Sequence, residues 1–415
     1  MRVSPPISST SLVYSPKQQE RFIKYQQTQQ QQISTQFTKR RCKINDITLY
    51  DCGGHRQTSR SVSWNSTGTF LSFASSFDRL AKIWTIDSSS ATNNNNTREY
   101  TALMGHTAPV ERVRFHPNEP SLLCTAAEDR SVRIWDIRHN NNHNHNRSNN
   151  HKMELKSPDK YGNCPASIEW STQGMYVAVG EKNDVVHVYD VRKCDTNQPC
   201  ASFDLSTQHS VLQECHFSPC GQHLVAATKS SVDGMGQVRI WRWNTGGGGD
   251  DEEEVKDDAS VFVGHTGPIY TLAFSPDGTR LATGGSDALV GLWDVSTMVC
   301  ASTITRRTKF VRSVAFSYDS KFVASCSEED GVDISLACDG SKVGLVSLSS
   351  TATEGGGGGG GQQQQQQQRG YQMNYGNGIG GGADEICFHP KAYIIACARN
   401  YSSTGGGGGG GGSGA

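Results

Sequence analysis

Two short stretches of this chain hold the side-chain types of a hydrolytic triad: a hydroxyl, an imidazole and a carboxylate. The first set is His106, Thr125 and Asp129, and the second is His265, Thr283 and Asp287. In contact, such groups can activate an oxygen nucleophile. A Trp-Asp pair follows six residues after each Asp, at Trp135 and at Trp293. An enzyme needs its active site once, so the repetition favours a packing role over catalysis.

The segment around the second set predicts the element that positions these side chains. In residues 264–295, GHTGPIYTLAFSPDGTRLATGGSDALVGLWDV, apolar residues alternate in three runs separated by SPDG and GSD turns. This pattern predicts three short strands joined by tight turns. His265 can then bond the turn carboxylate, while Thr283 and the indole of Trp293 complete a buried network that keeps the carboxylate paired. Such a unit is one blade of a β-propeller.

Weaker copies of the unit fill much of the remaining chain. The first copy has His55, Asp78 and Trp84 in the His, Asp and Trp places, with Ala74 in the Thr place. The third has Tyr189 for Trp and Asn183 at the turn, the fourth ends at Trp241, and the sixth has Ser335 for Trp. The aromatic residues at 84, 135, 189, 241 and 293 are 51 to 54 positions apart. With a seventh copy starting at residue 384, the repeats predict an all-β, seven-bladed WD40 β-propeller.

The seventh copy stops before a recognisable last strand. A propeller closes by pairing an N-terminal strand with its last blade, and residues 43–52, KINDITLYDC, are the expected closing strand. From Gly405 the chain is glycine-rich. Three explanations stay open: an exposed edge, a strand borrowed from a partner, or a truncated gene end.

The predicted domain layout follows from these repeats. Residues 1–44 form a disordered, Gln-rich basic arm, residues 45–404 the propeller, and residues 405–415 a disordered Gly-rich tail. Low-complexity inserts interrupt the propeller at about 88–100, 139–158, 244–259 and 350–382. All four are expected to leave the same face, which keeps the face with the turn acids Asp78, Asp129 and Asp287 clear for partners. On that clear face the candidate contacts are the residues just before each turn acid: Phe77, Glu128, Lys182, Ser286 and Glu328.

Composition excludes several classes of function. The net charge of −1 argues against a protein that coats nucleic acid, and no apolar run is long enough for a membrane helix. The thirteen cysteines show no paired CxxC spacing, which favours a reducing compartment and free thiols. The Asn-rich run with His139, His143, His145 and His151 is more typical of disorder than of a metal site. The acidic run 250–258 is more typical of a solvated loop than of a nucleic-acid mimic.

Several strings resemble the THO complex subunit 3 family. They are SSFDRLAKIW at 75–84, EDRSVRIWDIR at 128–138, EKNDVVHVYDVR at 181–192, LATGGSDALVGLWDVSTMVC at 281–300 and VRSVAFSYDSKFVASCSEEDGVDIS at 311–335. The resemblance runs from about residue 46 to residue 400. It implies a nuclear scaffold subunit of a THO/TREX-type complex, which holds protein partners and acts in mRNA processing and mRNA export. The inserts and the absent last strand depart from the family's pattern, and the departures concern ring closure and the contacts of the seventh blade.

Two other functions are compatible with a propeller fold. A general WD40 scaffold, such as a ubiquitin-ligase substrate receptor or a signalling adaptor, is the alternative, although no adaptor-binding domain is recognisable. An enzyme is not favoured, because the chain has no phosphate-binding loop, nucleophile elbow or metal-ligand spacing. We therefore expect no cofactor, no metal, no small-molecule substrate and no membrane contact. RNA contact is expected to be indirect or through the basic arm, whose cluster Lys39-Arg40-Arg41 could also serve as a nuclear-import signal.

Overall fold

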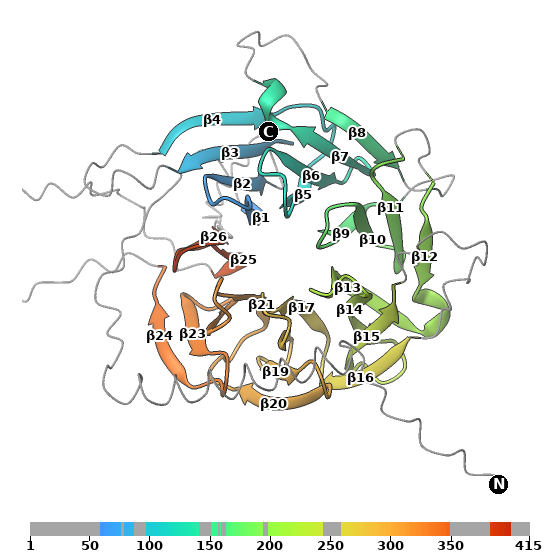
Figure 1. Ribbon diagram of the computed structural model, residues 1–415. Coiled ribbons are helices and arrows are strands. Elements are labelled where there is room, and N and C mark those ends of the chain that lie inside the picture. The colour runs from blue at the N-terminus through green and yellow to red at the C-terminus, as the bar shows by residue number, and fades with distance from the viewer. Residues whose placement is uncertain are drawn as a thin grey trace, which may run out of the picture.

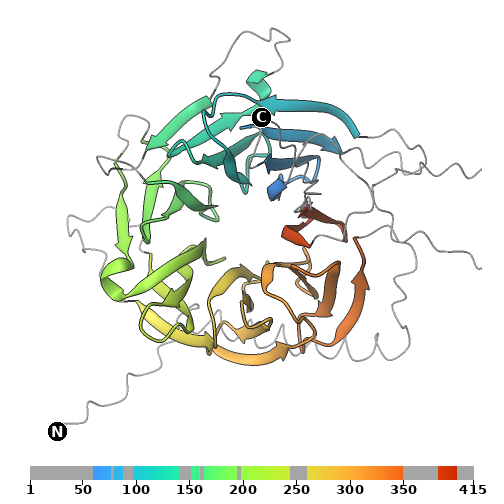
Figure 2. The ribbon, with the colours of Figure 1, turned by 180° about the vertical axis from the view of Figure 1, so that it is seen from behind.

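The strands of this protein are arranged as blades around a central axis (Figures 1 and 2). The computed structural model describes residues 59–75, 79–86, 97–140, 151–156, 158, 163–193, 198–243, 259–348 and 382–399. In this part of the chain six antiparallel sheets have four strands and a seventh has two. The prediction of an all-β propeller is confirmed, with the seventh blade described only by its first two strands.

Each blade is built from consecutive strands, ordered from the axis outward. Blade one has β1 (Ser59–Trp64), β2 (Phe70–Ser75), β3 (Ala81–Ile86) and β4 (Thr97–Leu103). Blade two has β5 (Val110–Phe115), β6 (Leu122–Ala127), β7 (Ser131–Asp136) and β8 (His151–Lys156), and blade three has β9 (Pro165–Trp170), β10 (Tyr176–Glu181), β11 (Val185–Asp190) and β12 (Ala201–Asp204).

The second half of the ring follows the same order. Blade four has β13 (Ser210–Phe217), β14 (His223–Ser230), β15 (Gly236–Arg242) and β16 (Ser260–His265), and blade five has β17 (Ile269–Phe274), β18 (Arg280–Gly285), β19 (Val290–Asp294) and β20 (Val299–Ile304). Blade six has β21 (Val311–Phe316), β22 (Phe322–Ser327), β23 (Val332–Leu336) and β24 (Lys342–Val346), and blade seven has β25 (Ala383–Phe388) and β26 (Ile395–Arg399). Two short 3-10 helices, η1 (Ile137–Asn140) and η2 (Ser206–Gln208), lie between strands.

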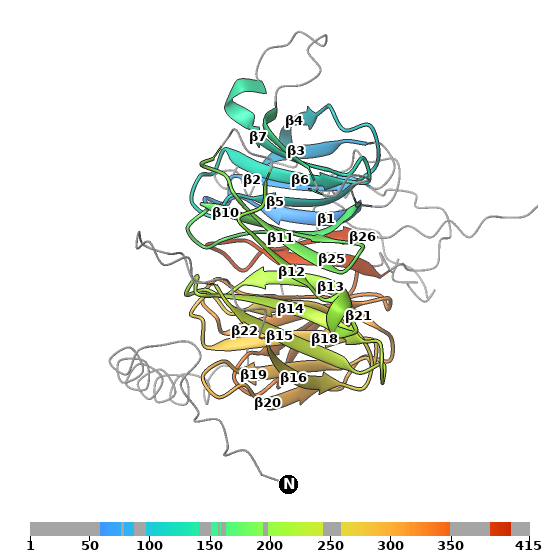
Figure 3. The ribbon, with the colours of Figure 1, turned by 90° about the vertical axis from the view of Figure 1, so that its right-hand side faces the viewer.

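Neighbouring blades pack face to face around the ring, which Figure 3 shows edge-on, and the hydrophobic core lies between them. Between blades one and two, for example, Ala74 and Leu103 pack with Val113, Leu123 and Trp135. Each blade therefore buries its apolar side chains only when its neighbours are in place, which is the logic of a repeat protein.

The predicted bounds of two inserts are wrong because they include outer strands of the blades. The repeats predicted three strands in a blade, whereas the structure has a fourth in blades one to six. Strand β4 begins at Thr97 and β8 spans His151–Lys156, so the inserts placed at 88–100 and 139–158 are shorter than predicted. The outer sequences TREYTAL and HKMELK alternate charged and apolar residues only partly. Such weak alternation gives no clear strand signal, so the sequence pattern does not separate these strands from the inserts.

Blade seven closes the ring against blade one. Val62 and Leu71 of blade one form one buried cluster with Ala396 and Ala398 of blade seven. The amide of Val62 donates to the carboxylate of Glu385 over 2.8 Å. The predicted closing strand at residues 43–52, the arm 1–44 and the tail 405–415 lie outside the described residues.

The two faces of the ring differ in the connections they carry. We call the face with the links between second and third strands, such as residues 128–130, the turn face. Since the strands are antiparallel, the links between blades also lie on the turn face, and the links between third and fourth strands lie on the opposite face. The inserts at 87–96, 141–150 and 244–258 follow third strands, so the described residues that flank them lie on the opposite face.

The fourth insert leaves the turn face, which corrects the prediction that this face is free of inserts. It follows β24, the fourth strand of blade six, and precedes β25. Before it, the amide of Leu348 donates to Asp330 over 3.2 Å. After it, a Cβ at Gly382 would lie 2.1 Å from the carbonyl oxygen of Ser327. Both ends of the insert are therefore held beside the turn of blade six.

Deleting residues 355–368 is expected to leave the melting temperature unchanged within about 2 °C, since both flanking segments are anchored independently of the tract. Thermal unfolding of the deletion variant beside the full chain tests this. Aggregation, or a clearly lower melting temperature, would mean that the tract is needed for folding.

Candidate functional site

The triad-like residues of blade two form one buried hydrogen-bonded chain. His106 Nδ1 lies 2.9 Å from Asp129 Oδ2, and its Nε2 lies 2.7 Å from Thr125 Oγ1. The indole of Trp135 donates to the same Thr125 oxygen over 2.8 Å. The chain runs from the turn acid through the imidazole and hydroxyl to the third strand, so it connects four segments of one blade.

Blade five repeats this geometry. His265 Nδ1 lies 2.9 Å from Asp287 Oδ1, its Nε2 lies 2.8 Å from Thr283 Oγ1, and the indole of Trp293 donates to Thr283 over 2.9 Å. Thr125 and Thr283 are both 0% exposed. A substrate therefore has no access to either hydroxyl, which favours a structural role for both sets.

The turn acids are strongly held in their ionised form. Burial alone would raise the pKa of Asp129, but the hydrogen bond and charge of His106, together with Ser131 and the Thr107 amide, hold it well below its usual range. The pKa of Asp287 is also lowered, since His265, Leu289 and Thr266 outweigh the effect of burial. Each carboxylate thus connects two segments of the chain: the turn in which it lies, and the link that leads into its blade.

The remaining predicted network residues do not form a third complete set in the described structure. Trp84 lies in β3, half-buried, while His55 and Asp78 lie outside the described residues. In blade three the hydroxyl of Tyr189, which takes the Trp place, donates to the carbonyl of Lys156 over 3.1 Å.

Blade six uses a different set, which the sequence reading missed. Arg307 stands 22 residues before Glu329, as His265 stands 22 before Asp287, and the two side chains are 3.6 Å apart. The guanidinium of Arg307 also donates to the carbonyls of Ser325 and Gly331. The equal spacing was the signal that could have identified this Arg-Glu replacement.

Arg306 fills the place left by the absent tryptophan. Its guanidinium pairs with Asp333 at 2.6 Å and donates to the hydroxyl of Ser335 and the carbonyl of Gly340. Ser335 and Asp333 also bond each other. The blade that lacks the aromatic residue is thus held by two arginines of the preceding link.

The four predicted partner contacts that the structure describes lie on the turn face, and two of them face each other. Lys182 Nζ is 3.4 Å from Glu128 Oε1, so blades two and three present a surface ion pair. Glu328 pairs with Arg312. Ser286 is half-buried against Gly267, and Phe77 lies outside the described residues. Their role as partner contacts stays a prediction.

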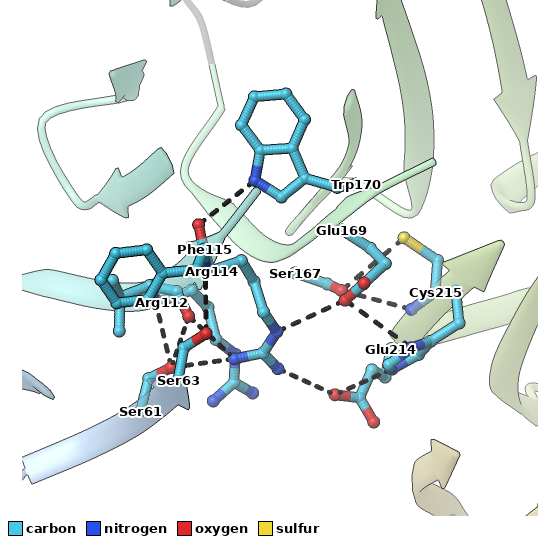
Figure 4. A network of polar contacts seen from close by, with 12 residues as sticks. Ser61, Ser63, Arg112, Arg114, Phe115, Ser167, Glu169, Trp170, Glu214 and Cys215 are labelled. Atoms are coloured by element: carbon cyan, nitrogen blue, oxygen red, sulfur yellow. Dashed lines mark hydrogen bonds and ion pairs between the residues drawn. The ribbon is translucent and has the colours of Figure 1, made fainter. Parts of the chain in front are cut away.

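A cluster of charged side chains lies on the innermost strands, and the sequence reading did not find it (Figure 4). Arg114 of β5 is 3.4 Å from Glu169 of β9, 3.8 Å from Glu214 of β13 and 2.5 Å from Glu385 of β25. Its Nη1 also donates to Ser61 of β1 over 3.2 Å. One guanidinium therefore connects blade two to blades one, three, four and seven.

Side chains of the inner strands also bond the backbone of the next blade. In each bond a backbone amide donates to a side-chain oxygen of the neighbouring blade. The pairs, with the amide first, are Val113 and Ser61, Phe115 and Ser63, Cys215 and Ser167, Leu272 and Glu214, Ile386 and Ser313, and Val62 and Glu385. Because sheets of neighbouring blades share no backbone ladder, these bonds satisfy inner-strand amides that would otherwise be unpaired. The charged cluster and these hydrogen bonds therefore connect the inner strands of neighbouring blades around the ring.

The charges of the cluster stabilise one another. Burial alone would raise the pKa of Glu214, but His216, Arg112 and Arg114 lower it to about 2. Burial would lower the pKa of His216, but Glu169 and Glu214 raise it above its usual value. The neighbouring thiol of Cys215 has its pKa raised to about 12, chiefly by burial. That thiol therefore stays protonated at neutral pH and is a poor nucleophile.

Stability is expected to fall as the pH drops from about 4.5 towards 2, where Glu214 takes up its proton in the folded state. A depressed carboxyl pKa contributes stability above its unfolded value and loses it as the pH falls through its folded value. Replacing Glu214 with Gln should flatten the pH dependence of the melting temperature in that window. An unchanged slope, equal to that of the exposed control Glu119→Gln, would contradict the assignment.

The described part of the chain shows neither a metal-binding group nor a membrane-spanning helix. No group of three or more His, Cys, Asp or Glu side chains there is arranged to hold a metal ion. Among the same residues, no helix has the length and apolar character needed to cross a membrane.

Comparisons with known proteins identify repeats and relatives. Residues 47–85, 97–136, 257–294 and 298–332 match the model for "WD domain, G-beta repeat". The chain is 29% identical over 281 residues to THO complex subunit 3 of Arabidopsis thaliana, covering 68% of this chain and 77% of that protein. It is 24% identical over 289 residues to WD repeat-containing protein AAC3 of Dictyostelium discoideum, covering 66% of this chain and 54% of that protein. It is 25% identical over 222 residues to apoptotic protease-activating factor 1 of Danio rerio, covering 51% of this chain and 15% of that protein.

Proposed function

Because this chain is a WD40-repeat protein folded as a β-propeller, we propose that it is a non-catalytic scaffold subunit of a nuclear THO/TREX-type complex. In that role it would couple transcription to mRNA processing and to mRNA export. The observation that carries the proposal is the similarity to THO complex subunit 3, which extends over most of both chains.

The structure supports a scaffold rather than an enzyme. The triad-like hydroxyls are buried, and the charged cluster on the axis is occupied by contacts between blades. The exposed turns and links of the ring remain as contact surfaces, which is how propellers usually act. The partners in this proposal are protein subunits, with RNA contact indirect or through the basic arm at residues 1–44.

A general WD40 scaffold, such as a ubiquitin-ligase substrate receptor or a signalling adaptor, is the second candidate. The observation in its favour is the range of relatives at similar identity, which includes an apoptotic protease-activating factor. Relatives this varied share the repeat, and the repeat alone carries no single activity.

Affinity purification of the tagged full-length protein from nuclear extract, with and without nuclease, separates the two. The export proposal expects the other THO subunits to be recovered in both samples, since protein contacts hold them. Recovery of cullin adaptors or signalling proteins instead would favour the second candidate. THO subunits that disappear with nuclease would mean that RNA, and not this scaffold, connects them.

A further inference from the structure

The link that leads into blade six differs in composition from the other described links. Residues 305–312, TRRTKFVR, which comprise the link after β20 and the first two residues of β21, carry four cations and no acid. Arg306 and Arg307 are used internally, because they pair with Asp333 and Glu329. The amide of Thr308 also donates to Glu329 over 2.9 Å. The link is therefore anchored at its start, and the residues that follow are presented in a fixed position.

Phe310 stands where other blades have proline. It precedes the first residue of β21, as Pro268 precedes β17 and Pro109 precedes β5. Those prolines show that the repeat does not require an aromatic ring at this place. Phe310 is 41% exposed, so its ring contributes only part of its apolar surface to the fold. Packing within the blade therefore does not explain why Phe310 is aromatic.

The ring belongs to a small surface group that we call the Phe310 patch, consisting of Tyr270, Lys309, Phe310 and Arg312. The rings of Phe310 and Tyr270 are 5.9 Å apart, and the Arg312 guanidinium lies 5.2 Å from the Tyr270 ring and 5.9 Å from the Phe310 ring. Lys309 is exposed beside them. Aromatic rings held with arginine on a rigid element are typical of the anchors at protein interfaces.

The cations of the patch can accept a carboxylate. Lys309 makes no ion pair with the residues that the structure describes. Arg312 pairs with Glu328, and the side chains are 37% and 41% exposed. An exposed pair of this kind is worth at most about 1 kcal/mol, so a partner's carboxylate can take the place of Glu328.

We propose that the Phe310 patch docks a short peptide in which a large apolar side chain lies next to an acidic residue. The apolar side chain would cover Phe310 and Tyr270, and the acid would pair with Lys309 or Arg312. This inference rests on the proposed scaffold function and names the kind of partner segment that one edge of the turn face takes.

The charges around the patch favour a peptide over single-stranded nucleic acid. Glu328 and Asp330 lie in the turn beside the patch, and Asp330 bonds Ser347 at the start of the following insert. A phosphate backbone running past these carboxylates would be repelled, because nucleic-acid grooves need continuous positive charge. A peptide with a single acid beside its apolar anchor needs only one cation.

The test is selection of a phage-displayed library of random twelve-residue peptides on the purified full-length protein. Enriched peptides are then labelled, and their affinity is measured by fluorescence polarisation. We expect an aromatic or large aliphatic residue next to Asp or Glu. Phe310→Ala and Lys309→Glu should each weaken binding at least about tenfold, as for a central anchor and its charge partner.

Tyr318→Ala is the matched control, because it removes an aromatic ring of similar exposure, 39%, from the opposite face. It should leave the affinity unchanged, and the melting temperatures of all variants should equal that of the parent. Enriched peptides that bind Phe310→Ala as tightly as the parent would overturn the proposal. So would a uridine dodecamer whose binding depends on Phe310, or peptides that bind only after residues 355–368 are deleted.

The two proposals fail separately. Peptide binding that depends on Phe310, without recovery of THO subunits from nuclear extract, would leave the docking site and remove the export function. Recovery of those subunits by the Phe310→Ala variant, with no peptide selected, would leave the export function and remove this site.

Discussion

Replacing Arg114 with alanine is expected to lower the free energy of unfolding by about 3 to 5 kcal/mol, because it leaves partly buried carboxylates without their cation. The substitution leaves Glu169, Glu214 and Glu385 close together near the axis without the cation that all three contact. It also removes the donor to Ser61. Urea unfolding followed by tryptophan fluorescence measures the loss.

Two further variants separate the charge from the packing. Arg60→Ala removes an arginine that also pairs with a glutamate, Glu111 at 2.6 Å, but from a half-exposed site. Its cost should stay below about 1 kcal/mol. Adding Glu385→Gln to Arg114→Ala should cost much less than the two single losses together, since one unpaired carboxylate is neutralised. Strict additivity would contradict the role of Arg114 as the shared cation.

Asp287→Ala is expected to destabilise the protein by about 2 to 4 kcal/mol, because it removes the acceptor of a buried imidazole and of two turn amides. His265 would lose its Nδ1 partner, and the amides of Thr266 and Leu289 would lose theirs. Thermal and urea unfolding measure the effect.

The control for Asp287 is Glu119→Ala, an exposed acid in a link on the opposite face, which should change stability by no more than about 0.5 kcal/mol. In the double variant with His265→Ala, the second substitution should add little, because the pair acts as one unit. If Asp287→Ala melts with the parent protein, the hydrogen-bonded chain of blade five does not contribute to its stability.

The hydrogen-bonded interior of blades two and five could be predicted because the residues that form it lie close together in the sequence. His265, Thr283, Asp287 and Trp293 lie within 29 consecutive residues, and their spacing repeats in blade two. The outer strands were harder to predict because strands such as β8, β16 and β20 have exposed residues, so their apolar pattern is weak. Strand β8, HKMELK, has charged residues at both ends of its exposed face and reads as part of the Asn-rich insert.

The central cluster could not be predicted from repeat patterns. Arg114 and Glu385 are 271 positions apart, and each looks like an exposed polar residue of its own strand. Only closure of the ring brings the two side chains together. The face of the fourth insert was mispredicted for a related reason, since an unrecognised outer strand in blade six moves the connection from one face of the ring to the other.

The contact between Val62 and Glu385 also has a consequence for synthesis of the protein. The two residues are 323 positions apart, and at 5 to 20 residues per second a ribosome needs on the order of 15 to 65 s to make the intervening chain. Throughout that time the blade-one side chains Val62 and Leu71 lack the blade-seven residues Ala396 and Ala398 that pack against them. The nascent chain therefore exposes apolar surface, of the kind that chaperones bind, until blade seven is made. We expect substitutions in blade seven to lower the yield of folded protein more than its stability.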